Sequence, residues 1–201
     1  MNYLLSTAYL PPSVWFAYCI QAEGGIRLEK NENFVKQSFR NRCRIQTSQG
    51  PLDLSIPLVH SSSRKIDEVE ISYAEEWRKN HWRAIQSAYS KAPFFAILAA
   101  EMEELLLQTQ VLRLWDWNEM WIHWVFKWLD VTPSLSYSNN FELNPSNTLD
   151  LRNSIHPKKE LPVSIESAIH LTPMIQQMGS LSVLHLLCYE GPNAFSELAG
   201  K

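Results

Sequence analysis

The sequence contains little of what builds a covalently linked, metal-held or membrane-spanning protein. Its three cysteines, Cys19, Cys43 and Cys188, lie far apart, are odd in number and form no metal-ligand spacing. Structural disulfides belong to oxidising compartments, so reduced thiols in a cytoplasmic protein are the simplest interpretation. The apolar run over residues 92–100 is too short to cross a bilayer. We therefore expect a cytoplasmic chain with no metal centre and no transmembrane segment.

Glycine is also scarce, and its distribution excludes several nucleotide-binding motifs. The chain has six glycines, and the adjacent pair Gly24–Gly25 follows a predicted helix. Phosphate-binding loops and the dinucleotide fingerprint place their glycines before a helix, so neither motif is present. No nucleophile elbow is found. No cofactor is evident from these patterns.

Positive charge is not in excess, so any anion must be bound by a local patch. The 18 basic and 21 acidic residues give a net charge of −3, which provides no general attraction to nucleic acid or anionic membrane. We expect no nucleic-acid partner, since the tryptophans lie on a helical stripe and not among the arginines.

Residues 36–44, here called the basic segment, supply such a patch. If the segment is extended, its side chains alternate between two faces. One face then carries Lys36, Ser38, Arg40, Arg42 and Arg44, and the other carries Gln37, Phe39, Asn41 and Cys43. Arginine side chains match phosphate and carboxylate groups in a bidentate manner, so the first face suits an anionic ligand. The alternative is a half-buried strand whose polar face is solvated.

Hydrophobic periodicity and turn residues predict a mixed α/β fold. We expect a strand over residues 3–8, a turn at 9–12, a helix over 13–22 capped by Ser13, and a strand over 26–29. A β-hairpin is predicted around residues 36–57, and alternating residues weakly favour a strand over 66–73. The second half is predicted to be helical, at 75–89, 93–107, 112–129 and 180–189. We expect one domain over 1–201 with a small central sheet. Residues 134–162, rich in Ser, Asn and Pro, are expected to form a long functional loop or a loosely ordered segment.

Four blocks of the sequence together resemble the WbqC-like protein family, in the short form typical of Bacteroidetes. They are the turn at residues 8–12, the stretch 29–45, the central helical block 77–95 and the C-terminal helix 181–192. The sequence departs from the family pattern at His185, where an acidic residue is expected, and at Cys188, where an aromatic residue is usual. Any family site that uses the C-terminal helix is therefore in question.

The resemblance implies a role connected with surface polysaccharide, because the family takes its name from a gene cluster for the lipopolysaccharide O-antigen. We expect a transferase-type enzyme that acts on a phosphate-bearing activated substrate, such as a sugar nucleotide. The reaction itself is left open. The alternative is a non-catalytic binding or scaffold protein of a polysaccharide pathway.

Candidate site residues follow from the basic segment, with the family blocks adding weight to them. The predicted anion ligands are Tyr9 in the turn after the first strand, and Lys36, Gln37, Arg40, Asn41, Arg42 and Arg44 in the basic segment. His81 or Glu32 is the candidate for proton transfer. His81 shares a helical stripe with Trp77, so a hydrogen-bonded core histidine is the competing interpretation. Glu32 can equally be an ion-pair partner of Lys36.

Overall fold

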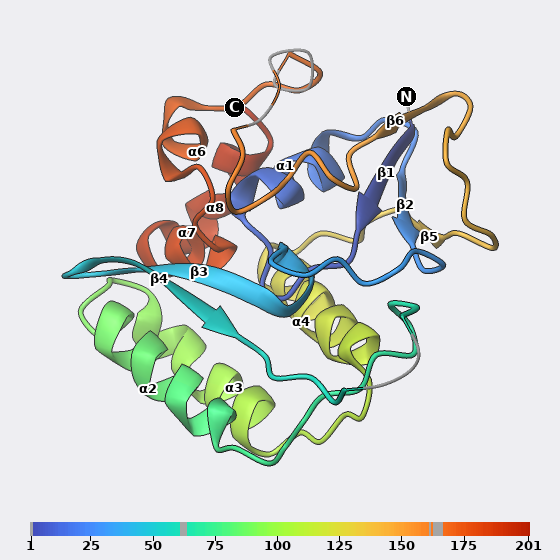
Figure 1. The fold of residues 1–201 in the computed structure, drawn as a ribbon. Helices are drawn as coiled ribbons and strands as arrows, with labels where there is room; N and C mark the ends of the chain where they lie inside the picture. Colours follow the sequence, from blue (N-terminus) through green and yellow to red (C-terminus); the bar gives the residue numbers. More distant parts are fainter. Residues whose placement is uncertain (1, 61–63, 161, 163–166) are drawn as a thin grey trace.

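A four-stranded parallel sheet forms one side of the molecule (Figure 1). It combines β1 (Asn2–Ser6), β2 (Ile26–Glu29), β5 (Leu135–Tyr137) and β6 (Thr148–Asp150) in the order β5-β2-β1-β6. The computed structural model describes residues 2–60, 64–160, 162 and 167–201. The last four residues of β1 are buried, as parallel strands require when both faces of a sheet are covered. The helix α1 (Ser13–Gln21) connects β1 to β2.

The sequence also predicts the β-hairpin, and the structure confirms it. β3 (Arg42–Thr47) pairs antiparallel with β4 (Gly50–Ser55), and Arg42 lies opposite Ser55. The extended conformation begins only at Arg42, so the predicted alternation of faces does not extend back to Lys36. Gln37 adopts a left-handed conformation with φ of 58°, and residues 39–41 form a 3-10 turn. The first half of the basic segment is therefore a turn and the second half a strand.

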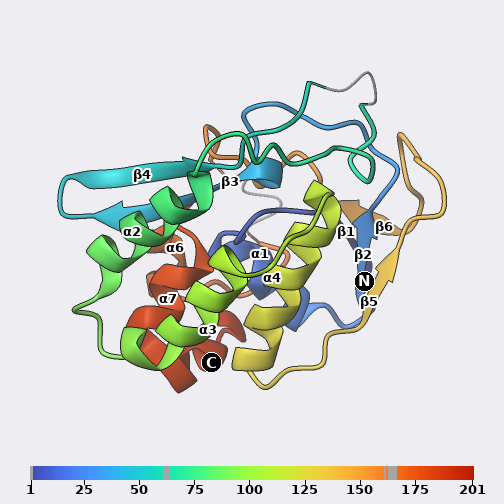
Figure 2. The same cartoon turned by 90° about the horizontal axis from the view of Figure 1, so that it is seen from below.

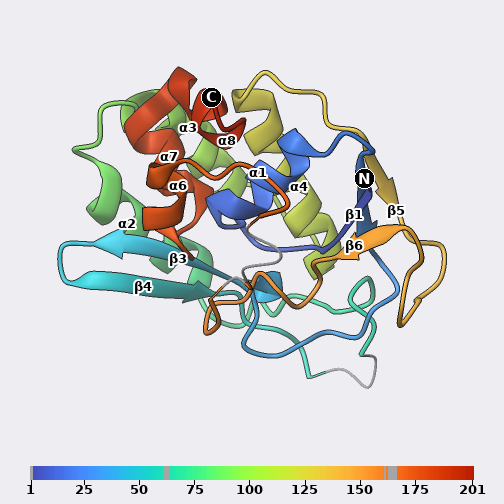
Figure 3. The ribbon, with the colours of Figure 1, turned by 90° about the horizontal axis from the view of Figure 1, so that it is seen from above.

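Helices lie against the hairpin on both sides. On one side α2 (Trp77–Tyr89) packs against β3 and α3 (Phe95–Leu107) packs against α2, while α4 (Leu114–Trp128) lies beside α3, as Figure 2 shows from below. On the other side lie three short C-terminal helices, seen from above in Figure 3: α6 (Pro173–Met178), α7 (Val183–Glu190) and α8 (Ala194–Leu198). The tryptophan stripe of α4 faces the core, where Trp117, Trp121 and Trp124 are buried. The result is the mixed α/β domain that the sequence predicts.

Two local predictions differ from the structure for physical reasons. Ser13 does not cap α1, because the helix already begins at Ser13 and Pro12 precedes it without a side-chain cap. Residues 66–73, a weak strand candidate, form only isolated bridges, in which Ile71 pairs with Leu58 and Glu70 with Arg113. In residues 66–73 the alternation of apolar and polar side chains reflects partial burial of the segment. It does not require a complete ladder of backbone hydrogen bonds.

Candidate functional site

The order of the parallel strands identifies a crevice between β1 and β6. From β1 the chain proceeds through α1 to β2 and β5 on one side, whereas β6 pairs with β1 on the other side. Ligands of open α/β sheets bind outside the carboxyl ends of the strands at such a reversal. The segments that leave these two carboxyl ends are residues 7–12 and 151–160. Both contribute to the same cavity.

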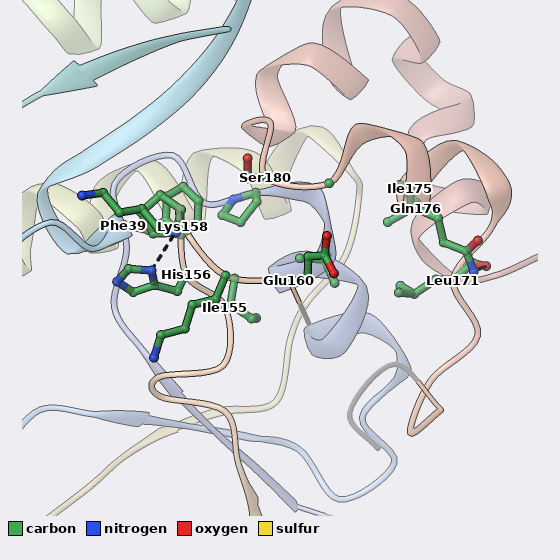
Figure 4. A pocket seen from close by; sticks show the side chains of 14 residues that line it. Phe39, Ile155, His156, Lys158, Glu160, Leu171, Ile175, Gln176 and Ser180 are labelled. Atoms are coloured by element: carbon green, nitrogen blue, oxygen red, sulfur yellow. Dashed lines mark hydrogen bonds between the residues drawn. The ribbon is translucent and has the colours of Figure 1, made fainter. Parts of the chain in front are cut away.

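A cavity of about 640 Å³ opens at this point, and Figure 4 shows its walls. Its volume is within the range of small-molecule sites. The cavity receives side chains from the start of α1, from the basic segment, from the segment after β6 and from α6 with the turn that follows it. The lining residues are Pro12, Val14, Phe39, Ile155, His156, Pro157, Lys158, Lys159, Glu160, Leu171, Ile175, Gln176, Gly179 and Ser180.

One wall of the cavity, here called the cationic wall, carries the ammonium groups of Lys158 and Lys159 beside the ring of His156. Figure 4 shows His156 and Lys158 on this wall. The Nζ of Lys158 donates to Oε1 of Gln37 at 2.7 Å. The Nδ1 of His156 accepts the backbone N–H of Lys158 at 3.2 Å, which assigns the ring proton to Nε2. Partial burial, with repulsion from Lys159, Arg40, Lys158 and Arg42, lowers the pKa of His156. The ring is therefore neutral at pH 7 within a cationic environment.

The basic segment contacts the segment after β6 at successive positions. Besides the Gln37 contact with Lys158, Nη2 of Arg40 donates to the carbonyl of Arg152 at 3.3 Å. Nη1 of Arg44 donates to the carbonyl of Pro157 at 3.0 Å and to Oγ of Ser180 at 2.9 Å. Arg44 thus ties two walls of the cavity to the hairpin. The segment that the sequence identifies as anion-binding also builds the site.

Arg40 and Glu32 form a buried ion pair behind the cavity. Nε and Nη2 of Arg40 donate to the two carboxylate oxygens of Glu32 at 2.8 and 2.6 Å, and both side chains are at most 5% exposed. Nη2 of Arg40 also donates to Oγ of Ser6, at the carboxyl end of β1, at 2.6 Å. This is the fork-to-fork geometry of strong arginine–carboxylate pairs. The pair fixes the basic segment to the end of β1.

A second buried pair joins the ends of β2 and β6. Nη1 of Arg152 donates to Glu29 at 3.1 Å, and its Nε and Nη2 donate to Asp150 at 2.9 and 2.5 Å. Glu29 additionally accepts the backbone N–H of Asn31 at 2.8 Å and the hydroxyl of Ser138, just after β5. Charged and hydroxyl groups thus connect all four strands of the parallel sheet at the edge that carries the cavity.

The structure brings two other predicted residues, Tyr9 and His81, together in the core. The hydroxyl of Tyr9 and Nδ1 of His81 are 3.2 Å apart, and the rings stack with centroids 5.8 Å apart. Burial lowers the pKa of His81 to about 4, and a backbone hydrogen bond with Ser55 opposes this shift. Burial also raises the pKa of Tyr9. Neither side chain is among the described residues that line the cavity after β6.

The remaining predicted residues are distributed over the hairpin and a second cavity. Lys36 and Asn41 line a space of about 900 Å³ beside residues 56–60, where Nδ2 of Asn41 donates to the Ile56 carbonyl at 2.9 Å. Arg42 approaches Asp53 at 3.9 Å. Arg44 forms two bonds to the same carboxylate, at 2.6 and 3.0 Å. The predicted set is therefore divided among contacts that support the first cavity, the lining of the second cavity, and the core, and none of it is among the described residues that line the first cavity.

Sequence reasoning did not select the cationic wall as a site. His156, Lys158 and Lys159 lie at the end of the segment 134–162, and their clustering was visible in the sequence. The missing information was β6, which ends at Asp150 and is only three residues long. A cationic cluster soon after a parallel strand is a binding signal only once that strand is known.

No group of three or more His, Cys, Asp or Glu side chains suited to a metal ion occurs within the described part of the chain. Within the same residues, no helix has the length and apolar character needed to cross a membrane.

Comparisons with known proteins identify relatives whose chemistry is not described. A family model described as the WbqC-like protein family matches residues 7–194. The chain is also 32% identical, over 122 residues, to a curated protein of Mycobacterium tuberculosis described as "Uncharacterized protein Rv1507c". That match covers 60% of this chain and 52% of the relative, so the chain spans about half the length of the curated relative it matches. No solved structure matches the chain at a significant level.

Proposed function

Because the chain belongs to the WbqC-like protein family, we propose that it binds a phosphate-bearing activated small molecule at the carboxyl edge of its parallel sheet and transfers a group from it. The observation that carries the proposal is the cationic wall of His156, Lys158 and Lys159 in a cavity of about 640 Å³ at the strand-order reversal.

The cationic wall suits a phosphate group on electrostatic grounds. Lys158 and Lys159 are exposed, and neither forms an ion pair within the described residues. Hydrogen bonds between charged partners contribute about 1.5–3 kcal/mol each, so two ammonium groups account for much of the affinity of a micromolar ligand. Arg42 adds positive potential, as its effect on the pKa of His156 indicates.

His156 provides the group for proton transfer in this proposal. Its Nδ1 is occupied by the Lys158 backbone, so Nε2 carries the proton and is the nitrogen available to a ligand. Burial and neighbouring cations hold the pKa of the ring below its usual value in the unliganded protein. A bound phosphate offsets that repulsion and favours the protonated ring, in which Nδ1 gains a proton and gives up the hydrogen bond that it accepts from Lys158. Nε2–H can then protonate the departing phosphate oxygen as a general acid.

The biological setting is part of the same proposal. The family name points to lipopolysaccharide O-antigen and surface-polysaccharide biosynthesis in bacteria, and sugar nucleotides are phosphate-bearing donors of the kind the cavity suits. We place the protein in the cytoplasm, where such donors are made. His81 and Glu32 stay predictions for proton transfer. In the structure the His81 ring contacts the Tyr9 hydroxyl, and the Glu32 carboxylate accepts hydrogen bonds from Arg40. A non-catalytic binding protein of the pathway is the competing proposal.

A thermal-shift titration with UDP-glucose, other sugar nucleotides and coenzyme A thioesters tests the proposal. A ligand at one hundred times its Kd adds about 2.7 kcal/mol, which corresponds to roughly 5–11 °C for a chain of this size. The shift should disappear in a Lys158→Ala/Lys159→Ala variant. It should persist in a matched Lys65→Ala/Lys91→Ala variant, which removes two exposed lysines outside the cavity.

Two other results would separate the alternatives. A shift that the Lys158/Lys159 variant retains would mean that the ligand binds elsewhere. Stabilisation by a sugar nucleotide without release of UDP, in the presence of candidate acceptors, would favour the non-catalytic function. Release of UDP that depends on His156, measured with a His156→Gln variant, would favour the transferase.

A further inference from the structure

The cavity wall beyond the lysines carries hydrogen-bond acceptors. Figure 4 shows His156 and Lys158 at one end, Glu160 near the middle and Gln176 towards the other end. Nε2 of Gln176 donates to the carbonyl of Leu171 at 3.2 Å, which fixes the amide orientation and leaves Oε1 as its acceptor. The carboxylate of Glu160 forms no ion pair or hydrogen bond within the described residues. This wall therefore presents acceptor oxygens.

The cavity also has an apolar lining, to which Val14, Phe39, Ile155, Leu171 and Ile175 contribute. Figure 4 shows Phe39 beside Lys158, and Leu171 and Ile175 beside Gln176. The Oγ of Ser180 accepts a hydrogen bond from Arg44, so its own hydroxyl proton is directed elsewhere. A ligand along this cavity meets cations at one end, the Glu160 carboxylate near the middle, and the Gln176 amide with apolar side chains at the other end.

This polarity specifies the direction in which a ligand binds. A phosphate placed beside Glu160 meets a like charge, whereas a phosphate beside Lys158 and Lys159 is neutralised. The remainder of the ligand then lies against Glu160 and Gln176. Acceptor oxygens are satisfied only by N–H or O–H donors, and leaving them unpaired on binding carries a desolvation cost.

We infer that the phosphate-bearing ligand carries a neutral polyhydroxylated body, a sugar, whose hydroxyl groups donate to Glu160 and Gln176. The inference rests on the proposed function, since it assigns the second half of the same site. A pyranose fits the features present, because its C–H face packs on apolar side chains while its equatorial hydroxyls donate at the rim. Glu160 is then the specificity-determining residue, and the lysines hold a group common to all sugar nucleotides.

Isothermal titration of UDP and UDP-glucose tests the assignment, because UDP-glucose carries the sugar that UDP lacks, while the additional negative charge on the terminal phosphate of UDP favours UDP at the lysines and so works against the expected preference. We expect UDP-glucose to bind the wild-type chain at least about tenfold more tightly than UDP, the effect of one or two hydrogen bonds to a charged acceptor. In a Glu160→Ala variant this ratio should fall to about twofold or less, with the Kd of UDP changed by less than about threefold. Glu160 is exposed, so the variant is expected to fold, and its melting temperature provides the check.

A Glu160→Gln variant distinguishes a hydroxyl group from an amine. The amide keeps an acceptor oxygen, so it should retain part of the preference for UDP-glucose. If UDP-glucosamine is preferred instead, and Glu160→Gln abolishes that preference, the ligand is an amine and the neutral-sugar assignment is wrong.

The two proposals fail in different ways. If neither UDP nor any sugar nucleotide binds at millimolar concentration, the proposed function is wrong and this inference is lost with it. If UDP binds through the lysines but UDP-glucose, UDP-galactose and UDP-N-acetylglucosamine bind no better, the phosphate site stands and the sugar assignment is overturned. A preference that survives in Glu160→Ala also overturns the role of Glu160.

Discussion

Arg40 offers the sharpest test of how the basic segment works. Its guanidinium is 4% exposed and forms two bonds to Glu32, one to Ser6 and one to the Arg152 carbonyl. An Arg40→Met variant preserves most of the side-chain volume and leaves the Glu32 carboxylate buried without a cation. The reasoning predicts that this variant is destabilised mainly by that unpaired charge.

The magnitude follows from the burial of the pair. Removing one partner of a buried ion pair costs about 3–5 kcal/mol, whereas replacing both with apolar groups is close to neutral. A domain of this size is stable by about 5–15 kcal/mol, so the single variant loses a substantial part of that stability. The Arg40→Met/Glu32→Leu double variant should recover most of the loss. Arg42→Met, which removes a half-exposed contact to Asp53 at 3.9 Å, should cost less than about 1 kcal/mol.

Urea unfolding followed by circular dichroism measures these free energies, and the wild type, the two single variants and the double variant of the Arg40–Glu32 cycle give a coupling energy. We expect a coupling of about 2–4 kcal/mol and an unchanged m-value. Two results refute the reasoning: an Arg40→Met variant within about 1 kcal/mol of the wild type, or a double variant as unstable as the sum of the single ones. Either would mean that the pair is not a buried structural contact, and Arg40 would again be a candidate for direct contact with the ligand.

Three further predictions concern other parts of the chain. Burial lowers the folded-state pKa of His81 to about 4 from an ordinary 6.5, so the unfolded chain binds a proton at this residue before the folded protein does. The free energy of unfolding should therefore fall by about 3 kcal/mol between pH 6.5 and pH 4. The urea midpoints of the wild type and of His81→Phe should converge near pH 4. Gly191→Ala should lower the free energy of unfolding by about 2–4 kcal/mol in thermal unfolding, because φ is +51° and a Cβ would lie 2.4 Å from the Phe94 ring. Gly179→Ala has a similar φ of +53° but open space around the Cβ, so it should cost about 1 kcal/mol. Arg44→Ala releases Pro157 and Ser180 and should weaken UDP binding about tenfold or more in calorimetry, while Arg44→Lys should restore little of it.

The first part of the fold was predictable because local and long-range signals agree there. The apolar run in β1, Pro11 and Pro12 before the helix, and Gly24–Gly25 after it define a strand–helix–strand unit in the sequence. The long helices were predicted for the same reason, since their apolar stripes repeat over several turns. β5 and β6 were not predicted, because three residues carry no periodicity and their pairing depends on β2 and β1.

The site was predictable only as a collection of residue types. The sequence identifies Arg40 and Arg44 as cations in one segment, and it does not reveal that Glu32 and Asp53 already engage them. Gln37 illustrates the reason, because its left-handed conformation ends the expected alternation of faces. Which side chain faces which partner was determined by contacts with residues more than one hundred positions away, such as Lys158.

The buried pair between Glu29 and Arg152 has a consequence for the way the chain acquires its structure. The two residues are 123 positions apart, and the strand beside which Arg152 lies pairs with the first strand of the protein. During synthesis, β1 and β2 leave the ribosome long before β6 does. Until then the Glu29 carboxylate has no contact with Arg152. Closure of such a long loop is slow, and exposed strand edges invite misassociation in the meantime. The edge that holds the cavity is therefore the last part of the sheet to form.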